Sequence, residues 1–148
     1  MDERAVSTTV SYTLTLAIAA VLVSGLLFTG GQFVSGQREQ VVRSELRVVG
    51  QQVAADLQRA DRLATAGRGP TVVAIERDHP DAVAGTTYDV ALESGPARLV
   101  LTATDPEVTV SVPLSVDRSV QAGAADGGTI VVRYDNVTGA GALVIEND

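Results

Sequence analysis

Residues 10–34 read VSYTLTLAIAAVLVSGLLFTGGQFV, and no charged residue occurs between Arg4 and Arg38. The apolar core of a bilayer is about 30 Å thick, and a helix needs roughly 20 apolar residues to cross it. The stretch contains no proline, so a helix through it can satisfy its own backbone hydrogen bonds within lipid. These features predict a membrane-spanning helix. A soluble core helix is the alternative, but a chain of 148 residues hardly provides enough protein to bury it on all sides.

The rest of the chain is acidic and limited in size. About 110 residues follow the apolar stretch, which is enough for one hydrophobic core. All 11 basic residues are Arg, against 18 Asp and Glu, and the formal net charge is −7. This composition suggests adaptation to high salt, although codon bias can contribute, and it argues against nucleic-acid binding, which relies on basic side chains. The chain has no Cys, which removes disulfides, thiolate metal sites and cysteine nucleophiles.

The N-terminus carries a resemblance to a known family. Arg4-Ala5 is followed by Val6-Ser7-Thr8-Thr9 and then by the long apolar stretch. This order resembles the N-terminus of archaeal type IV pilin-like proteins, including minor pilins with a class III signal, and the haloarchaeal ones in particular. The resemblance implies that a prepilin peptidase cuts between Ala5 and Val6 on the cytoplasmic side, which makes residues 1–5 a leader. Val10 stands where many bacterial type IV pilins have Glu, so the likeness is to the archaeal proteins.

The resemblance also implies that residues 6–36 form a transmembrane helix that packs against copies of itself in a filament core. Small residues such as Ala and Gly let helices approach closely in lipid. The expected filament-core positions are Val10, Leu14, Ala17, Ala20, Val21, Ser24, Gly25 and Phe28. An ordinary single-pass helix is one alternative, because Ala and Gly are frequent there too. A conventional signal cut after Gly36 is another, and it would release a secreted domain that begins at Gln37.

Residues 37–67 predict an amphipathic helix that continues this stem. Apolar side chains recur every three or four residues, at Val42, Leu46, Val49, Val53, Leu57, Ala60 and Leu63 or Ala64. This spacing places them on one face of a helix. Gly67 and the pair Gly69-Pro70 are expected to end it.

Residues 70–148 predict a small antiparallel β-sheet domain. Turns that contain Gly, Pro, Asp or Asn separate six segments with the residue pattern of strands. These segments are 71–76, 87–93, 98–103, 107–112, 129–134 and 142–146. Short connections favour antiparallel neighbours. The side chains expected to face helix 37–67 are Tyr88, Val90, Leu92, Leu99, Leu101, Val108, Val110 and Val112. The predicted fold class is α+β: a long N-terminal, partly transmembrane α-helix with a small C-terminal antiparallel β-sheet domain packed on its outer half. This arrangement agrees with the fold that the pilin-like resemblance implies.

Few residues suggest chemistry. Asp78-His79-Pro80-Asp81 holds the only His and could bind a cation, but a loop rich in Asp and Pro is expected to be a solvated turn. The sequence has no second His and no Cys that could complete a metal site or a nucleophile–base pair. We therefore expect no metal, no cofactor and no enzymatic activity. Gly123 to Gly128 is expected to be a surface loop and not a phosphate cradle, because no Lys follows. Asn136-Val137-Thr138 is an N-glycosylation sequon, whose modification would place the sheet outside the cell.

The orientation in the membrane is open to two interpretations. Arg4 precedes the apolar stretch, and three arginines follow it, at Arg38, Arg43 and Arg47. Counting Lys and Arg therefore favours a C-terminal side in the cytoplasm. The pilin-like resemblance implies the opposite. We favour the latter, because Glu39 and Glu45 accompany these arginines and strong salt screens weak charge biases.

The resemblance implies a subunit, major or minor, of a type IV pilus-like filament for adhesion, motility or secretion. The expected partners are the membrane, other pilin-like subunits, a prepilin peptidase and a pilus or secretion assembly machinery, with no nucleic acid. The expected location is the cell membrane with an extracellular C-terminal domain, or a surface filament. The alternative is a single-pass, membrane-anchored β domain that binds a ligand or partner without polymerising.

Overall fold

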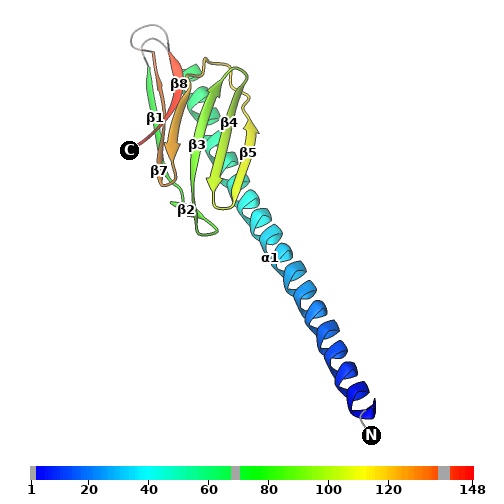
Figure 1. Ribbon diagram of the computed structural model, residues 1–148. Helices are drawn as coiled ribbons and strands as arrows, with labels where there is room; N and C mark the ends of the chain where they lie inside the picture. The colour runs from blue at the N-terminus through cyan, green and yellow to red at the C-terminus, as the bar shows by residue number, and fades with distance from the viewer. Residues whose placement is uncertain (1–2, 68–70, 137–140) are drawn as a thin grey trace. The chain divides into compact units, whose positions relative to one another are not determined.

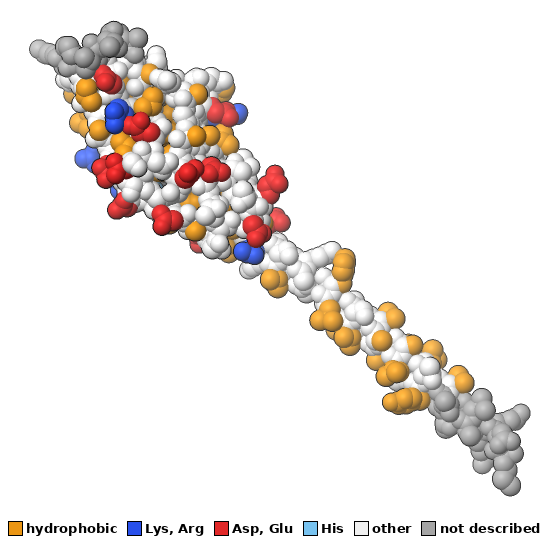
Figure 2. Space-filling model, turned by 60° about the vertical axis from the view of Figure 1, so that its left-hand side comes forward, with side chains coloured by type: hydrophobic (Ala, Val, Ile, Leu, Met, Phe, Trp, Pro, Cys, Tyr) orange, Lys and Arg blue, Asp and Glu red, His pale blue; other side chains and the backbone are white. Residues whose placement is uncertain are grey.

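The computed structural model describes residues 3–67, 71–136 and 141–148, with no side chains described for residues 3–9. Its elements are α1 (Glu3–Ala66), β1 (Val72–Asp78), β2 (Ala82–Val83), β3 (Thr86–Ser94), β4 (Ala97–Thr104), β5 (Glu107–Pro113), β6 (Gly123–Asp126), β7 (Thr129–Asp135) and β8 (Ala142–Asn147) (Figure 1). The chain divides into two compact units, Met1–Gln37 and Arg38–Asp148, and α1 contributes to both. Figure 2 shows apolar side chains gathered along the first unit and acidic side chains over the second, which we call the head. The predicted α+β class is confirmed.

The strands of the head form two antiparallel sheets. One has the order β1-β7-β8, and the other has the order β2-β3-β4-β5 with β6 paired to β3. β4 pairs with one edge of β3, and both β2 and β6 pair with the other edge. On that edge β2 pairs with Thr86 and Thr87, and β6 pairs with residues 89–92. All six predicted strands are present, with ends that agree within two residues. β2 and β6 were not predicted.

The segment around β6 joins the two sheets. Asp126 N donates to Asn147 Oδ1 at 2.9 Å, and Asn147 Nδ2 donates back to Asp126 O at 3.2 Å, which ties β6 to β8. A Cβ added at Gly123 would lie 2.9 Å from Ile145 O, so this approach requires glycine. The prediction of a surface loop from Gly123 to Gly128 is therefore wrong for residues 123–126. Pairing with β3 makes them a strand despite their small side chains.

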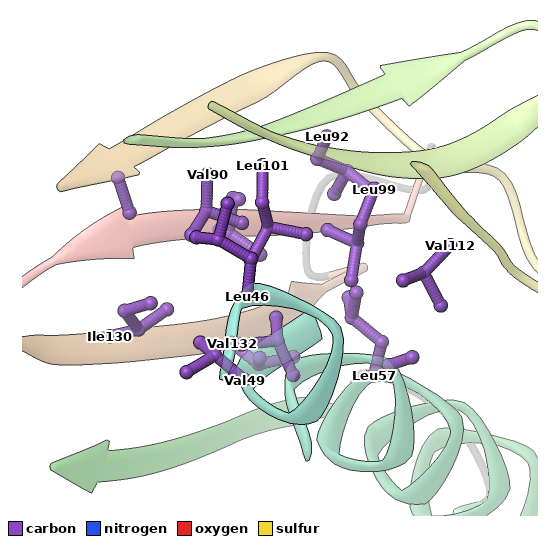
Figure 3. Close-up of a cluster of buried hydrophobic side chains, with 14 of the residues drawn as sticks. Leu46, Val49, Leu57, Val90, Leu92, Leu99, Leu101, Val112, Ile130 and Val132 are labelled. Carbon is purple, nitrogen blue, oxygen red and sulfur yellow. The ribbon is translucent and has the colours of Figure 1, made fainter. Parts of the chain in front are cut away.

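The core of the head lies between the 38–66 part of α1 and the two sheets. Figure 3 shows Leu46, Val49 and Leu57 of α1 among side chains from β3, β4, β5 and β7. The predicted apolar face is confirmed, and Ala64 (2% exposed) belongs to it while Leu63 (49%) does not. The strand side chains predicted to face the helix are all buried. Burying one Leu or Val side chain stabilises a fold by about 1.5–3 kcal/mol, so this interface holds the helix to the sheets.

One glycine sets how closely the helix and the sheet approach. A Cβ added at Gly50 would lie 2.8 Å from Leu101 Cδ1 and 2.9 Å from Val112 Cγ2. Real Cβ atoms do not sit so close to other carbons in a well-packed interior, so a larger residue would force the side chains of Leu101 and Val112 to move. The helix backbone at Gly50 therefore packs directly on the side chains of Leu101 of β4 and Val112 of β5.

The C-terminal end of α1 is held by a loop of the head. The helix ends at Ala66 as predicted, and Gly67 N closes the last turn by donating to Leu63 O at 3.1 Å. Arg118 Nη2 donates to Ala64 O at 3.0 Å, which places a positive charge where the helix dipole is negative. Buried Asp61 accepts hydrogen bonds from the backbone N atoms of residues 117 and 118, at 3.2 and 3.3 Å. Gly69 and Pro70 lie outside the described residues.

Candidate functional site

The first unit presents apolar side chains on every side of α1. From Val10 to Val34 the large apolar side chains are between 53% and 73% exposed, and none of the most apolar window is buried. The helix is long and apolar enough to cross a membrane. A helix that is apolar all round needs lipid or protein around it, because water is a poor solvent for every face. The first unit therefore has the character of a transmembrane anchor.

The hydroxyl groups of this helix find partners inside it. Thr15 Oγ1 donates to Ser11 O at 2.8 Å, and Thr29 Oγ1 donates to Gly25 O at 2.9 Å. Ser35 Oγ donates to the carbonyl four residues earlier at 3.1 Å. A Ser or Thr hydroxyl bonded to the preceding turn needs no water, so these residues do not oppose burial in lipid. The hydroxyls of Thr15, Thr29 and Ser35 are thus compatible with a membrane.

The eight predicted filament-core positions share one face of α1. They follow one another in steps of one, three or four residues, and at about 100° per residue they cover an arc of roughly 140°. Shallow hollows flank Ala17, one lined by Val10, Thr13 and Leu14 and the other by Ile18, Val21 and Leu22. Nothing lies within 4 Å of a Cβ added at Gly25, so its surface is open. Ala17, Ala20, Ser24 and Gly25 are the small residues of this face.

The two predicted processing residues lie near the start of α1. Ala5 and Val6 are helical, but their side chains belong to the part that the structure does not describe. Cleavage between them stays a prediction. The filament-core face begins at Val10, directly after this segment.

The predicted glycosylation residue has a structural role that the sequence did not indicate. Asn136 is half-buried after β7, and its Oδ1 accepts a hydrogen bond from Thr71 N at 2.6 Å. Asn136 N donates to Thr71 O at 3.2 Å, so the residue ties the end of β7 to the start of β1. Val137 and Thr138, the rest of the sequon, lie outside the described residues. Glycosylation of Asn136 stays a prediction.

His79 is buried, so the prediction of a solvated turn is wrong for this residue, although Asp78, Pro80 and Asp81 around it are exposed. The residue is 7% exposed, its N donates to Gly128 O at 3.1 Å, and its Nδ1 has no hydrogen-bond partner among the described residues. Burial lowers the pKa of its imidazole, and the charge of Arg77 lowers it further against the opposing effect of Asp56 and Asp78. Across residues 3–67, 71–136 and 141–148, no three His, Asp or Glu side chains gather as a metal site would require.

Tyr88 of β3 contacts the residue that follows His79. Its hydroxyl donates to Pro80 O at 2.8 Å, and the side chain is almost fully buried. Burial, together with the charge of Asp81, raises the pKa of Tyr88 to about 12. Of this loop only His79 is turned inward, because its neighbours Asp78, Pro80 and Asp81 are exposed.

Comparison with known proteins gives a family. A family profile, described as a family of unknown function (DUF7266), matches residues 1–146. The chain belongs to the DUF7266 family. The match includes both compact units, so the apolar helix and the β-sheet head belong together in DUF7266. No curated protein and no solved structure matches the chain.

The DUF7266 head has an uneven distribution of charge. Residues 38–148 contain 16 Asp and Glu and 10 Arg. Three arginines of the strands pair with carboxylates, Arg77 with Asp56, Arg98 with Glu93 and Arg133 with Glu146, at 2.6 to 2.7 Å. The exposed arginines of α1 form no ion pair within the described residues; they are Arg38, Arg43, Arg47, Arg59 and Arg62. The acidic side chains that Figure 2 shows on the head thus face solvent next to an arginine-bearing helix.

Proposed function

We propose that this protein is a pilin-like subunit of the cell envelope. A prepilin peptidase removes residues 1–5, the apolar part of α1 anchors the chain in the membrane, and the head lies outside the cell. Assembly into a type IV pilus-like filament then exchanges lipid around α1 for the helices of other subunits. No chemical reaction of the subunit is involved in this function.

The observation that supports the proposal most directly is the apolar surface of α1. In the part of the chain that the structure describes, the most apolar window of the helix is entirely unburied, and the hydroxyls of Thr15, Thr29 and Ser35 bond within the helix. Such a surface is stable either in lipid or against other apolar helices. Moving from one to the other costs little hydrophobic free energy, because lipid tails are as apolar as Leu side chains. Close packing at small residues such as Ala17 and Gly25 can then favour the assembled state.

A single-pass anchor that never polymerises is the second candidate. The same exposed helix supports it, because membrane anchoring alone accounts for apolar side chains on every face. The two candidates differ in what they require of the helix surface. An anchor needs only apolar character, whereas a filament subunit needs one face shaped for close helix contact.

Shearing of filaments from cells separates the two candidates. The epitope-tagged full chain is produced in its native host, surface filaments are sheared off, and both the filament and the membrane fractions are probed for the tag. We expect the chain in the sheared filaments of wild-type cells, and only in the membranes of a strain that lacks the assembly ATPase. A chain that stays in the membrane fraction of both strains would favour the plain anchor.

A further inference from the structure

A groove lies along one flank of α1 within the head. Its volume is about 590 Å³. Its walls come from Ser44, Glu45 and Val48 of α1 and from Asp78 and Val83 on the strand side. Val48 is 52% exposed, although it is a valine next to the core. The groove is therefore open, and its lining combines valine side chains with polar groups that include two carboxylates.

Each of the two carboxylates keeps an oxygen available for a ligand. Glu45 Oε2 accepts from Ala84 N at 2.7 Å and steadies the β2–β3 turn, where Ala84 has a φ of +46°. Asp78 Oδ1 accepts from Thr129 Oγ1 at 2.7 Å. Neither Glu45 nor Asp78 pairs with an arginine in the described ranges. A guanidinium on a long apolar stem suits such a groove, because the stem can lie along valine while the head binds carboxylate.

Arginines without a carboxylate partner lie on the other flank of the same helix. Arg43 and Arg47 are exposed, and both stand within the same turns of α1 as Glu45 and Val48. At about 100° per residue, the centre of the arginine pair lies roughly 150° around the helix from the centre of the groove. The two arginines therefore point away from the groove of their own chain.

We infer that Arg43 and Arg47 of one copy dock into the groove of a neighbouring copy, against Glu45 and Asp78. This inference rests on the proposed function and names a contact between heads in the filament. Opposite charges and an apolar floor make the two surfaces complementary. Because the surfaces differ, the contact is heterologous: each copy offers arginines on one flank and the groove on the other. Repeated contacts of this kind produce rings or open helical filaments, not closed two-fold dimers.

Charge reversal in the full chain tests the contact. We expect Arg47→Glu to lower the yield of sheared filaments about tenfold or more, since carboxylates would then face carboxylates at every contact. Asp78→Arg is expected to do the same, and the double variant R47E/D78R to recover most of the yield because each contact regains one charge of each sign. Arg62→Glu makes the same change of net charge about four turns further along α1 and should leave the yield within about twofold. Unchanged assembly of Arg47→Glu, an equal loss with Arg62→Glu, or a double variant no better than the single ones would overturn the inference.

Thiol crosslinking provides a second readout that does not alter the charges. The chain has no Cys, so Gln40→Cys on the arginine flank and Gln52→Cys in the groove each carry one thiol. In filaments assembled from a mixture of the two, a short bifunctional crosslinker should join position 40 to position 52 more than it joins like to like. A majority of 40–40 or 52–52 products would contradict a heterologous contact.

The two levels of the proposal fail in different ways. If the wild type forms filaments but the variants assemble equally well and the crosslinks are absent, the head contact is wrong and the filament function stands. If the wild type forms no filaments at all, both the proposed function and the head contact are overturned.

Discussion

Arg77 Nε lies 2.6 Å from Asp56 Oδ2, and Arg77 Nη2 lies 2.9 Å from Asp56 Oδ1. Asp56 is a buried residue of α1, whereas Arg77 is half-exposed on β1, an edge strand. The side-chain hydrogen bond to Asp56, together with its charge, raises the pKa of Arg77. The pair is bidentate, which fixes both the position and the orientation of the two groups. It therefore holds the edge of the three-stranded sheet against the helix.

Asp56→Asn should lower the free energy of unfolding of the head by about 1–3 kcal/mol, because it removes a charge-assisted hydrogen bond from a buried site. The matched control is Glu93→Gln, which breaks an exposed pair with Arg98 and should cost less than about 1 kcal/mol. Urea unfolding of the full chain in detergent measures both. An Asp56→Asn loss no greater than that of Glu93→Gln would show that the buried pair does not stabilise the head.

The stability of the head should fall as the pH falls below the ordinary pKa of histidine. Burial holds the pKa of His79 below 6.5 in the folded chain, so below pH 6.5 the unfolded chain binds more protons than the folded one. The stability that neutral His79 provides is therefore present above pH 6.5 and is lost as the pH decreases through the folded pKa. Urea unfolding between pH 7 and pH 5 should show a steeper loss for the wild type than for His79→Gln.

The same residue can be titrated directly. His79 is the only His of the chain, so its imidazole resonances need no assignment among others. A pKa at or above 6.5 by NMR would contradict the buried, unpartnered position of its ring.

Acidic residues in the apolar helix should release the chain from membranes. Each Asp near the centre of a spanning helix costs about 2.5–3.5 kcal/mol, so the double variant V21D/L22D should reduce the fraction that resists alkaline extraction severalfold. Ser111→Asp on the exposed side of β5 adds acidic charge without touching the helix and should leave extraction unchanged. Equal retention of V21D/L22D and wild type in the membrane pellet would argue against a spanning helix.

The shape of the filament-core face of α1 should matter for assembly into filaments but not for anchoring in the membrane. Ala17→Leu fills the hollows on that face, whereas Ala19→Leu makes the same change about 200° around the helix. Both variants should remain in the membrane, because both stay apolar. We expect only Ala17→Leu to lower the yield of sheared filaments. If both variants assemble equally well, close packing at this face is not what drives assembly.

Periodicity predicted most of the fold. The apolar side chains at steps of three and four in 42–64 and the alternation in 87–93 and 107–112 are strong signals, and the structure places them in one core. Turn residues then fixed the ends of the strands to within two residues. The sequence does not decide whether Leu63 or Ala64 is the last residue of the apolar helix face. Both fit a spacing of three or four residues from the preceding apolar position, because they are adjacent near the end of the helix.

The features that were missed depend on partners distant in the chain. β6, Gly-Ala-Ala-Asp, has little strand propensity of its own and becomes a strand by pairing with β3. The burial of His79 accompanies the backbone bond of His79 to Gly128 and the bond of Tyr88 to Pro80, whereas the Asp and Pro residues beside His79 indicate a turn. The groove likewise combines Glu45 with Asp78, which are far apart in the sequence. No local pattern carries such information.

The mass of the mature chain tests the account most directly. Intact-mass analysis or N-terminal sequencing of the protein purified from its native host reports where the chain begins. The account predicts a chain that starts at Val6, with the first five residues removed. A start at Met1 or Asp2 would contradict it and leave a plain anchor, and a start at Gln37 would indicate a secreted head without its helix.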